Sequence, residues 1–185
     1  MKTLFDGDTF EHNGHQFRVR FEYDVDGGYP WEDCDGHGPV RQSNLSHYAD
    51  RSDKHPGERP LNRADRNEYQ FYYDWQAAVK LARRDGWNAE PYDAPGRIER
   101  AVQANFDYLA GYVSDDWQYL VVTVEMLDSD GDVIADTNLG RVESYKDYHV
   151  ECAYELADEL IVQAKCEERQ ERINNRFPDA MVCGL

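Results

Sequence analysis

The sequence lacks any long run of apolar residues and any secretory leader pattern, and both absences limit where the protein can reside. No apolar segment approaches the length of about 18 residues that a membrane-spanning helix requires. The first residues do not show a basic stretch followed by an apolar one, which is the pattern of a signal peptide. We therefore expect a soluble, cytoplasmic protein.

Signatures of common enzymes are also absent. The chain has no Gly-x-Ser-x-Gly, P-loop, dinucleotide-binding or His-Glu-x-x-His motif. Its four cysteines are far apart and form no Cys-x-x-Cys pair, so neither disulfides nor a zinc site is expected. Cys34 and His37 imitate a nucleophile and its base, but catalytic pairs are usually assembled from distant segments. We expect no cofactor and no enzymatic activity.

Positive charge is scarce. The 185 residues include 20 Lys and Arg against 37 Asp and Glu, which gives a formal net charge of −17. Direct binding to DNA, RNA or an anionic membrane needs clustered Lys and Arg, so none of these is an expected partner. An acidic surface instead attracts basic surfaces. Residues 67–140 hold 14 acidic and 5 basic residues, a local net charge of −9.

What the sequence does contain is two hairpin patterns. Residues 117–126 are rich in Val, Thr and Tyr, with apolar side chains at every second position, and this predicts a strand. The turn residues Asp128 to Gly131 follow, and residues 133–139 form the returning strand. A second hairpin is predicted over Thr9 to Tyr23, because Asn13-Gly14 separates two alternating segments.

Three helices are predicted from apolar residues that recur every three or four positions. The first spans Tyr69 to Asp85 and ends at Gly86, and the second spans about residues 97–113. The third is capped by Ser144 with Asp147, and beyond Cys166 it continues as a solvated extension. We expect Val122 of the central strand to face Leu156 of this helix.

These patterns predict an α+β fold, with an antiparallel sheet of two hairpins and about three helices packed on one face. A chain of this length favours a single domain over residues 1–185. Glycine and proline break every periodic pattern between residues 24 and 67, which predicts an irregular insertion. Within it, we expect residues 41–66 to be the most mobile part, and we expect the C-terminus to fray after about residue 174.

The irregular insertion contains residue types that bind metals or perform acid–base chemistry. They show no fixed ligand spacing on a regular element, and glycine-rich turns recruit Asp for local hydrogen bonds, so no metal site is expected. An enzyme that uses Asp35 and His37 remains an alternative. The residues considered are Asp24, Asp26, Asp33, Asp35, His37, His47 and His55.

Acidic residues at the ends of the second helix and on the central hairpin form the candidate partner-binding surface. Proteins that mimic nucleic acid place carboxylates on a rigid scaffold about 6–7 Å apart, which is the span of two strand residues. The alternative is that the acid only keeps the protein soluble. Asp128, Asp130 and Asp132 do not form a calcium loop, because Gly131 falls at the fourth position. The candidates are Asp107, Asp115, Asp116, Asp128, Asp130, Asp132 and Asp136.

Four segments are similar to landmarks of small acidic accessory proteins of tailed bacteriophages and prophages. The resemblance covers about residues 15–162, and because the motifs have no assigned chemistry it transfers no functional residue. It implies a phage protein that acts in the host cytoplasm, where such proteins often disable host machinery. The segments are Tyr29-Pro-Trp-Glu32, Asp35-Gly-His-Gly-Pro-Val40, Ala82-Arg-Arg-Asp-Gly-Trp87 and Glu155-Leu-Ala-Asp-Glu159.

Together these observations favour a phage-encoded inhibitor of the anti-CRISPR or anti-restriction type. It would bind a basic, nucleic-acid-binding surface of a host defence or DNA/RNA-processing complex, with no direct contact to nucleic acid. Two alternatives stay open: a structural or assembly protein of the virion, and an enzyme with its site in the 24–67 segment.

Overall fold

The chain divides into two compact units. The first unit consists of residues 1–27 and 118–185, and the second consists of residues 28–117. The second unit is therefore inserted between two parts of the first. The structure is a computed structural model, and it describes residues 2–33, 36–43, 54–62, 69–89 and 95–176.

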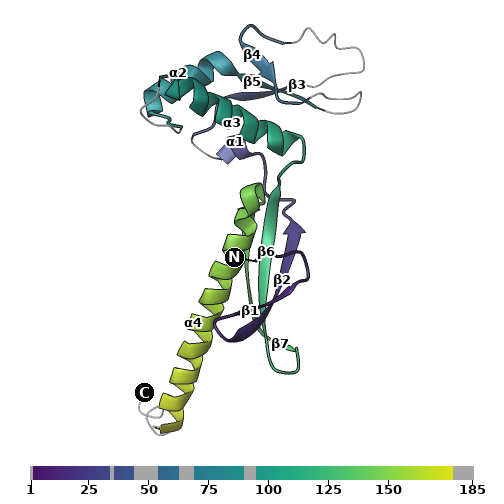
Figure 1. Cartoon of the computed structure of the whole chain (residues 1–185), viewed down its shortest axis with the longest axis vertical. Helices are drawn as coiled ribbons and strands as arrows, with labels where there is room; N and C mark the ends of the chain where they lie inside the picture. Colours follow the sequence, from purple (N-terminus) through teal and green to yellow (C-terminus); the bar gives the residue numbers. More distant parts are fainter. Residues whose placement is uncertain (1, 34–35, 44–53, 63–68, 90–94, 177–185) are drawn as a thin grey trace, which may run out of the picture. The chain divides into compact units, whose positions relative to one another are not determined.

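A four-stranded antiparallel sheet forms the centre of the first unit (Figure 1), with the strand order β1-β2-β6-β7. Positive φ angles of 50° at Asn13 and 83° at Gly14 close the first hairpin, as the sequence predicts. Both predicted hairpins are thus confirmed, they share one sheet, and the α+β class is confirmed. The strands are β1 (Thr9–His12), β2 (His15–Tyr23), β6 (Tyr119–Leu127) and β7 (Val133–Glu143).

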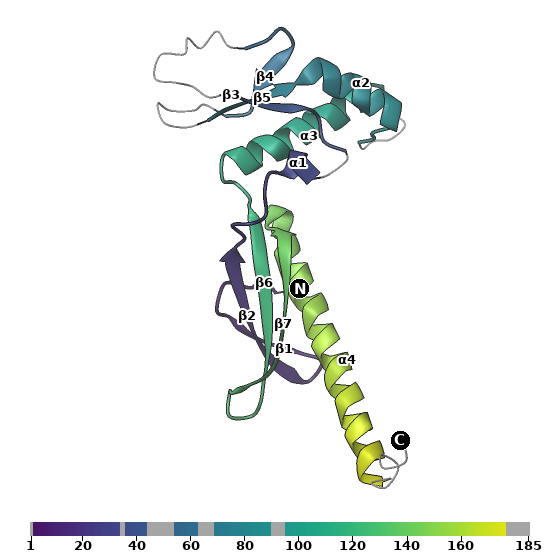
Figure 2. The same ribbon diagram turned by 180° about the vertical axis from the view of Figure 1, so that it is seen from behind.

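One long helix, α4 (Tyr148–Arg176), lies along one face of this sheet (Figures 1 and 2). Val122 and Leu156 are both buried in the core between sheet and helix, in agreement with their predicted packing. The predicted solvated extension is also present, since every residue of α4 from position 165 onward is exposed. Its last turns continue past the end of the sheet (Figure 2).

Ser144 does not cap the helix as predicted. Its hydroxyl instead accepts a hydrogen bond from the backbone N–H of Gln118, at 2.8 Å, and its side chain makes no cap bond. A short 3₁₀ turn, η1 (Tyr145–Asp147), separates it from α4. The helix is described as far as Arg176, and the rest of the predicted frayed terminus lies outside the described residues.

The second unit has a sheet that the sequence analysis missed, with strand order β3-β5-β4. Its core packs Tyr73 of the central strand against Ala78, Val102 and Leu109 of the two longer helices. These helices belong to this unit, so α4 alone packs on the sheet of hairpins. The elements are α1 (Pro30–Asp33), β3 (Val40–Ser43), β4 (Glu58–Pro60), β5 (Gln70–Asp74), α2 (Trp75–Asp85) and α3 (Arg97–Val113).

The helix predicted over Tyr69 to Asp85 is wrong in its first part. Residues 70–74 form strand β5, and the helix begins only after Asp74, whose carboxylate accepts a hydrogen bond from the N–H of Ala77 at 2.9 Å. Aromatic residues favour strands, and Asp favours the N-cap, so both local preferences act against the helical spacing. The predicted helix end is correct, because Gly86 has a left-handed φ of 71°.

The segment predicted to be irregular also contains α1, β3 and β4. These elements have three or four residues each, which is too short to produce a readable period in the sequence. Of the part predicted to be most mobile, residues 44–53 and 63–66 lie outside the described residues.

Candidate functional site

In the acidic turn between β6 and β7, one carboxylate is used within the fold and two are exposed. The Asp128 carboxylate accepts hydrogen bonds from the backbone N–H groups of Asp130 and Asp132, both at 2.9 Å. Asp128 thereby forms an Asx turn and uses its charge within the fold. The side chains of Asp130 and Asp132 are exposed, so they are the two carboxylates of this turn that a partner can reach.

Asp136 lies on the sheet face opposite to α4, next to a compensated carboxylate. It pairs in register with Glu125 of β6. The Glu125 carboxylate forms ion pairs with two arginines of β2. One is with Nε of Arg18, and the other is with Nη2 of Arg20 at 3.4 Å. This face therefore carries both signs of charge, and the two arginines offset much of the field around Asp136.

The other three candidates lie in the second unit, on or just after α3. Asp107 is exposed and accepts a hydrogen bond from Gln103 at 2.7 Å. Asp115 and Asp116 follow the C-terminus of the helix and are also exposed. A helix C-terminus already carries partial negative charge, so two carboxylates there raise the local negative potential at some cost in stability. The seven predicted residues thus form two groups, one in each unit.

A third group of carboxylates was missed by the sequence analysis. Glu151, Glu155 and Glu159 recur every four residues on α4, and all three are exposed; we call them the acidic stripe. Four helical residues rise about 6 Å, which is close to the spacing expected of a nucleic-acid mimic. The opposite face of the helix is buried against the sheet, so the stripe stands on a rigid support. The i, i+4 spacing of these residues is the signal that could have revealed it.

The acidic stripe has no Lys or Arg in its own part of the helix, whereas the end of the same helix does; from outside α4, Lys2 and Lys146 line a pocket with Glu151. Between residues 148 and 164 there are four acidic residues and no Lys or Arg, but residues 165–176 contain three acidic and four basic residues. Within the described chain, no Lys or Arg forms an ion pair with the stripe, while Arg172 approaches Glu168 at 3.5 Å. On an ordinary solvated helix face, acidic and basic residues are mixed, as they are over residues 165–176. The part of the helix that holds the acidic stripe differs from this pattern.

His37, considered for an enzymatic role, is held in a polar network that anchors its loop. The N–H of Gly38 and the hydroxyl of Tyr73 both donate to Oδ1 of Asn105, each at 2.9 Å. The Asn105 amide nitrogen must therefore donate to Nδ1 of His37, at 2.8 Å. The His37 ring also stacks on Tyr108. These contacts fasten His37 and Gly38 to α3 and β5, while Asp35 lies outside the described residues.

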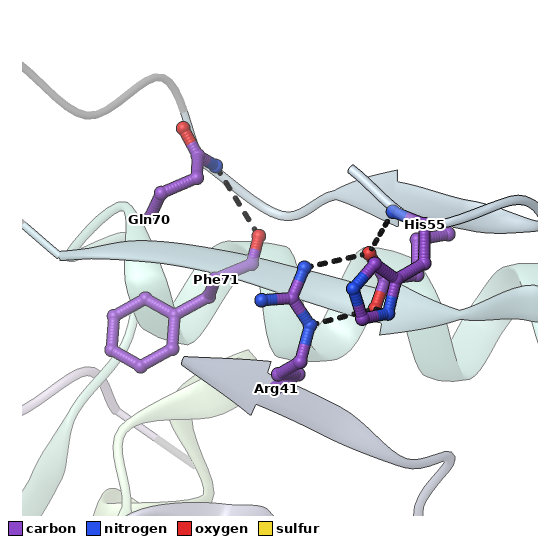
Figure 3. A network of polar contacts seen from close by, with 5 residues as sticks. Arg41, His55, Gln70 and Phe71 are labelled. Carbon is purple, nitrogen blue, oxygen red and sulfur yellow. Dashed lines mark hydrogen bonds and ion pairs between the residues drawn. The ribbon is translucent and has the colours of Figure 1, made fainter. Parts of the chain in front are cut away.

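A partly buried ion pair ties the edge strands of the smaller sheet together (Figure 3). Arg41 on β3 donates twice to the Glu58 carboxylate on β4, through Nε and Nη2 at 2.9 Å each. The His55 backbone N–H adds a third bond at 2.7 Å. The Arg41 guanidinium lowers the pKa of Glu58, while burial acts in the opposite direction. The groups that donate these hydrogen bonds to Glu58 lie on β3 and just before β4, so the ion pair holds the smaller sheet together.

The described residues contain no group of three or more His, Cys, Asp or Glu side chains placed to hold a metal ion. Among the helices in the described part of the chain, none combines the length and apolar character of a membrane span. Comparison of the chain with protein-family models, with curated proteins and with solved structures finds no match.

Proposed function

We propose that this protein is an acidic inhibitor that binds a basic, nucleic-acid-binding surface of a host defence or DNA/RNA-processing complex. The resemblance to phage accessory proteins points to such a role. One observation supports it most: the acidic stripe of Glu151, Glu155 and Glu159 is exposed, evenly spaced and without an ion pair to a Lys or Arg of the described chain, on a helix fixed to a sheet.

The rigid support matters for affinity. A flexible acidic tail would lose conformational freedom on binding, whereas carboxylates on a packed helix are already ordered. Their charge attracts a basic surface before contact and fixes the register afterwards. Each Lys or Arg that pairs with the stripe is then unavailable to a phosphate group, so binding of the inhibitor excludes DNA or RNA.

The test compares two triple variants that remove the same charge from the same helix. Glu151→Gln, Glu155→Gln and Glu159→Gln neutralise the stripe, and Glu167→Gln, Glu168→Gln and Glu171→Gln neutralise the balanced extension. All six side chains are exposed, so each substitution should change stability by less than about 0.5 kcal/mol. Immobilised wild-type and variant proteins are used to capture partners from a lysate of phage-infected bacterial host cells, with and without added DNA or RNA.

We expect wild type and the extension variant to capture a nucleic-acid-binding protein that added nucleic acid displaces. The stripe variant should capture much less of it. Capture of virion proteins that nucleic acid does not displace would instead support an assembly role. Equal capture by both variants would contradict the proposal.

A further inference from the structure

Strand β7 lies at an edge of the larger sheet. The order β1-β2-β6-β7 leaves one of its sides without a neighbouring strand in the described chain. The strand is 11 residues long and contains no Lys or Pro, which natural edge strands use to block pairing. Its apolar residues Ile134 and Leu139 are 60% and 45% exposed. A long, open edge of this kind is able to accept another strand.

The main chain of β7 directs hydrogen-bonding groups to this open side. In an antiparallel ladder, successive residues of a strand bond alternately to its two neighbours. The Asp24 N–H donates to the Tyr119 carbonyl, so odd-numbered residues of β6 bond toward β2 and even-numbered ones toward β7. Asp136 and Asn138 pair with odd-numbered residues of β6, so their own N–H and C=O groups point away from β6. Both residues are exposed.

Part of the acidic stripe projects from the flank of α4 on the β7 side. The other flank faces β1, because Tyr154 packs edge-on against Phe10 of that strand. The buried face of α4 lies between the two flanks. Residues of an α-helix are turned by about 100° each, which places Glu155 and Glu159 on the flank away from Tyr154.

The start of the helix shows the same neighbourhood. Tyr148 lies on the flank that carries Glu155, and β7 lies next to α4 (Figures 1 and 2). A hydrogen bond with Cys152 raises the pKa of Tyr148, and the charges of Glu155 and of Glu143 at the end of β7 act in the same direction. Charges in water act over short distances, so this flank of the helix and the end of β7 are close together.

We propose that the open edge of β7 pairs antiparallel with an extended segment of the basic partner in which Lys or Arg occupies every second position; this inference rests on the proposed function. The segment would continue the sheet about 4.8 Å beyond β7, with alternate side chains on the helix side. Lys and Arg there would lie beside Glu155 and Glu159, with their stems on Leu139, which shares the helix side with its partner Val122. Main-chain hydrogen bonds supply affinity in such complexes, and alternate side chains supply specificity.

A second copy of this chain fits the edge less well. Antiparallel pairing of two β7 edges about a two-fold axis would place both α4 helices on the same face of one sheet. The two acidic stripes would then lie on the same side of the junction, between chains that each have a net charge of −17. Repulsion of like charges opposes this arrangement, whereas a basic segment is attracted.

Peptides test the edge without the natural partner. A blocked peptide that alternates lysine with valine is titrated into the ¹⁵N-labelled full-length protein. In the proposed pairing, the lysines lie on the helix side and the valine N–H groups point to β7. A first control peptide therefore has N-methyl groups on its valines, which removes these donors, and a second has them on its lysines, which does not.

We expect saturable shifts of the Asp136 and Asn138 amides with the parent and the N-methyl-lysine peptide. The N-methyl-valine peptide has the same charge and should bind at least about tenfold more weakly, because it loses several hydrogen bonds. Equal binding of the two methylated peptides, or shifts that avoid β7, would overturn the inference. Concentration-dependent dimers of the protein alone, with shifts at β7, would also overturn it and assign the edge to a second copy.

The contribution of the stripe is measured with the parent peptide. Glu155→Gln with Glu159→Gln should weaken binding about two- to tenfold, the range for two exposed ion pairs. The control Glu167→Gln with Glu168→Gln removes the same charge from the same helix and should leave binding unchanged. Equal weakening by both double variants would show that the peptide responds only to net charge, and would overturn the proposed placement of its lysines.

A second pair of variants changes the strand itself. Asn138→Pro removes an N–H group that points to the open side, which an edge strand tolerates, and Asn138→Ala keeps it. Only the Pro variant should lose the peptide, and equal binding by both variants would contradict the pairing. If Asn138→Pro fails to fold, the two methylated peptides decide the question on the wild-type protein.

The outcomes for this edge and for the proposed function are distinguishable. If no peptide pairs with β7 but the stripe variant still loses its nucleic-acid-binding partner, the strand site is refuted and the proposed function stands. If the peptide pairs with β7 but no nucleic-acid-binding partner is captured, the strand site stands and the proposed function falls.

Discussion

Single acidic residues in this protein differ in whether their charge is used within the fold. Asp128 closes a turn with two backbone hydrogen bonds, and Glu58 is buried in an ion pair with Arg41. Glu155 has neither kind of contact among the described residues and is exposed. The net charge of −17 therefore overstates the charge that a partner can meet, and the burial of each carboxylate decides its role.

Removal of the buried carboxylate should destabilise the second unit. Loss of one partner from a fully buried ion pair costs about 3–5 kcal/mol. The Arg41 side chain is 32% exposed, which reduces this cost, so Glu58→Gln should lower the free energy of unfolding by about 2–3 kcal/mol. Urea denaturation at neutral pH measures this, with the exposed Asp107→Asn as control. A loss within about 0.5 kcal/mol would show that the pair contributes little.

His149 should make stability depend on pH. Its Nδ1 atom is buried without a hydrogen-bond partner, its ring meets Phe21 edge-on, and burial lowers its pKa from the ordinary 6.5. The nearby charge of Asp147 opposes this shift but does not cancel it. The unfolded chain therefore takes up a proton more readily, and the contribution of neutral His149 is present above about pH 6.5 and lost as the pH falls.

The replacement His149→Phe removes both the unpartnered nitrogen and the titration. We expect it to reduce the loss of unfolding free energy between about pH 8 and pH 5, relative to wild type. His15→Gln, which changes a histidine at the first hairpin, should keep the wild-type loss. If the Phe variant lost as much stability over this range as wild type, His149 would not be the source of the dependence.

At the scale of elements, sequence patterns predicted what local preferences determine. The helix over residues 97–113 was predicted with the bounds that α3 has, because five apolar residues repeat over its whole length. Strand β5 was missed because its aromatic residues also fit a helical period, although their strand preference and the N-cap preference of Asp74 favour a strand followed by a helix. The pairing with β3 and β4 that decides between the two joins separate segments of the chain, so a local pattern does not contain it.

Sequence composition also identified only part of the candidate binding surface. Exposed Asp115 and Asp116 were found by counting charge along the chain. The acidic stripe was missed because residues 141–185 have a net charge of only −4, an average over the acidic and balanced halves of α4. Which half faces a sheet and which is solvated depends on the length of the packed core, and composition does not contain that length.

Packing between β6 and α4 should supply much of the stability of the first unit. Val122 and Leu156 are buried in its core, and truncation of either to Ala should cost about 2–4 kcal/mol in unfolding free energy. Val162→Ala is the control, since this residue on the same helix is 61% exposed. Thermal and urea unfolding that leave Leu156→Ala and Val162→Ala equally stable would contradict this packing.

At the scale of the whole molecule, the second unit is inserted in the chain between β2 and β6, two strands that pair with each other in the sheet of the first unit. Tyr23 pairs with Leu120, and the Asp24 N–H donates to the Tyr119 carbonyl at 2.9 Å. The chain thus leaves the sheet and returns to it at adjacent positions. Insertions between two such close ends are well tolerated, since they do not disturb the host sheet. The single domain predicted from the sequence stays a prediction.

This topology predicts that the first unit folds without the insertion. In the test, residues 28–117 are replaced by a short glycine linker between Gly27 and Gln118. The hydrogen bond between Asp24 and Tyr119 shows that the ends are close enough for a tight connection. We expect dispersed amide resonances and cooperative unfolding, which would replace the single-domain organisation with two domains. A disordered spectrum would show that the units fold only together.

The central claim is that the acidic stripe, rather than the net charge of the whole protein, directs binding to the partner. Association rates with the captured partner test it most directly, measured at about 0.05 M and 0.5 M salt. At low salt the stripe variant Glu151→Gln, Glu155→Gln, Glu159→Gln should associate about three- to tenfold more slowly than wild type, and high salt should remove most of this difference. The extension variant Glu167→Gln, Glu168→Gln, Glu171→Gln loses the same charge and should associate at nearly the wild-type rate. Equal slowing of the two variants, or no slowing of either, would contradict the account.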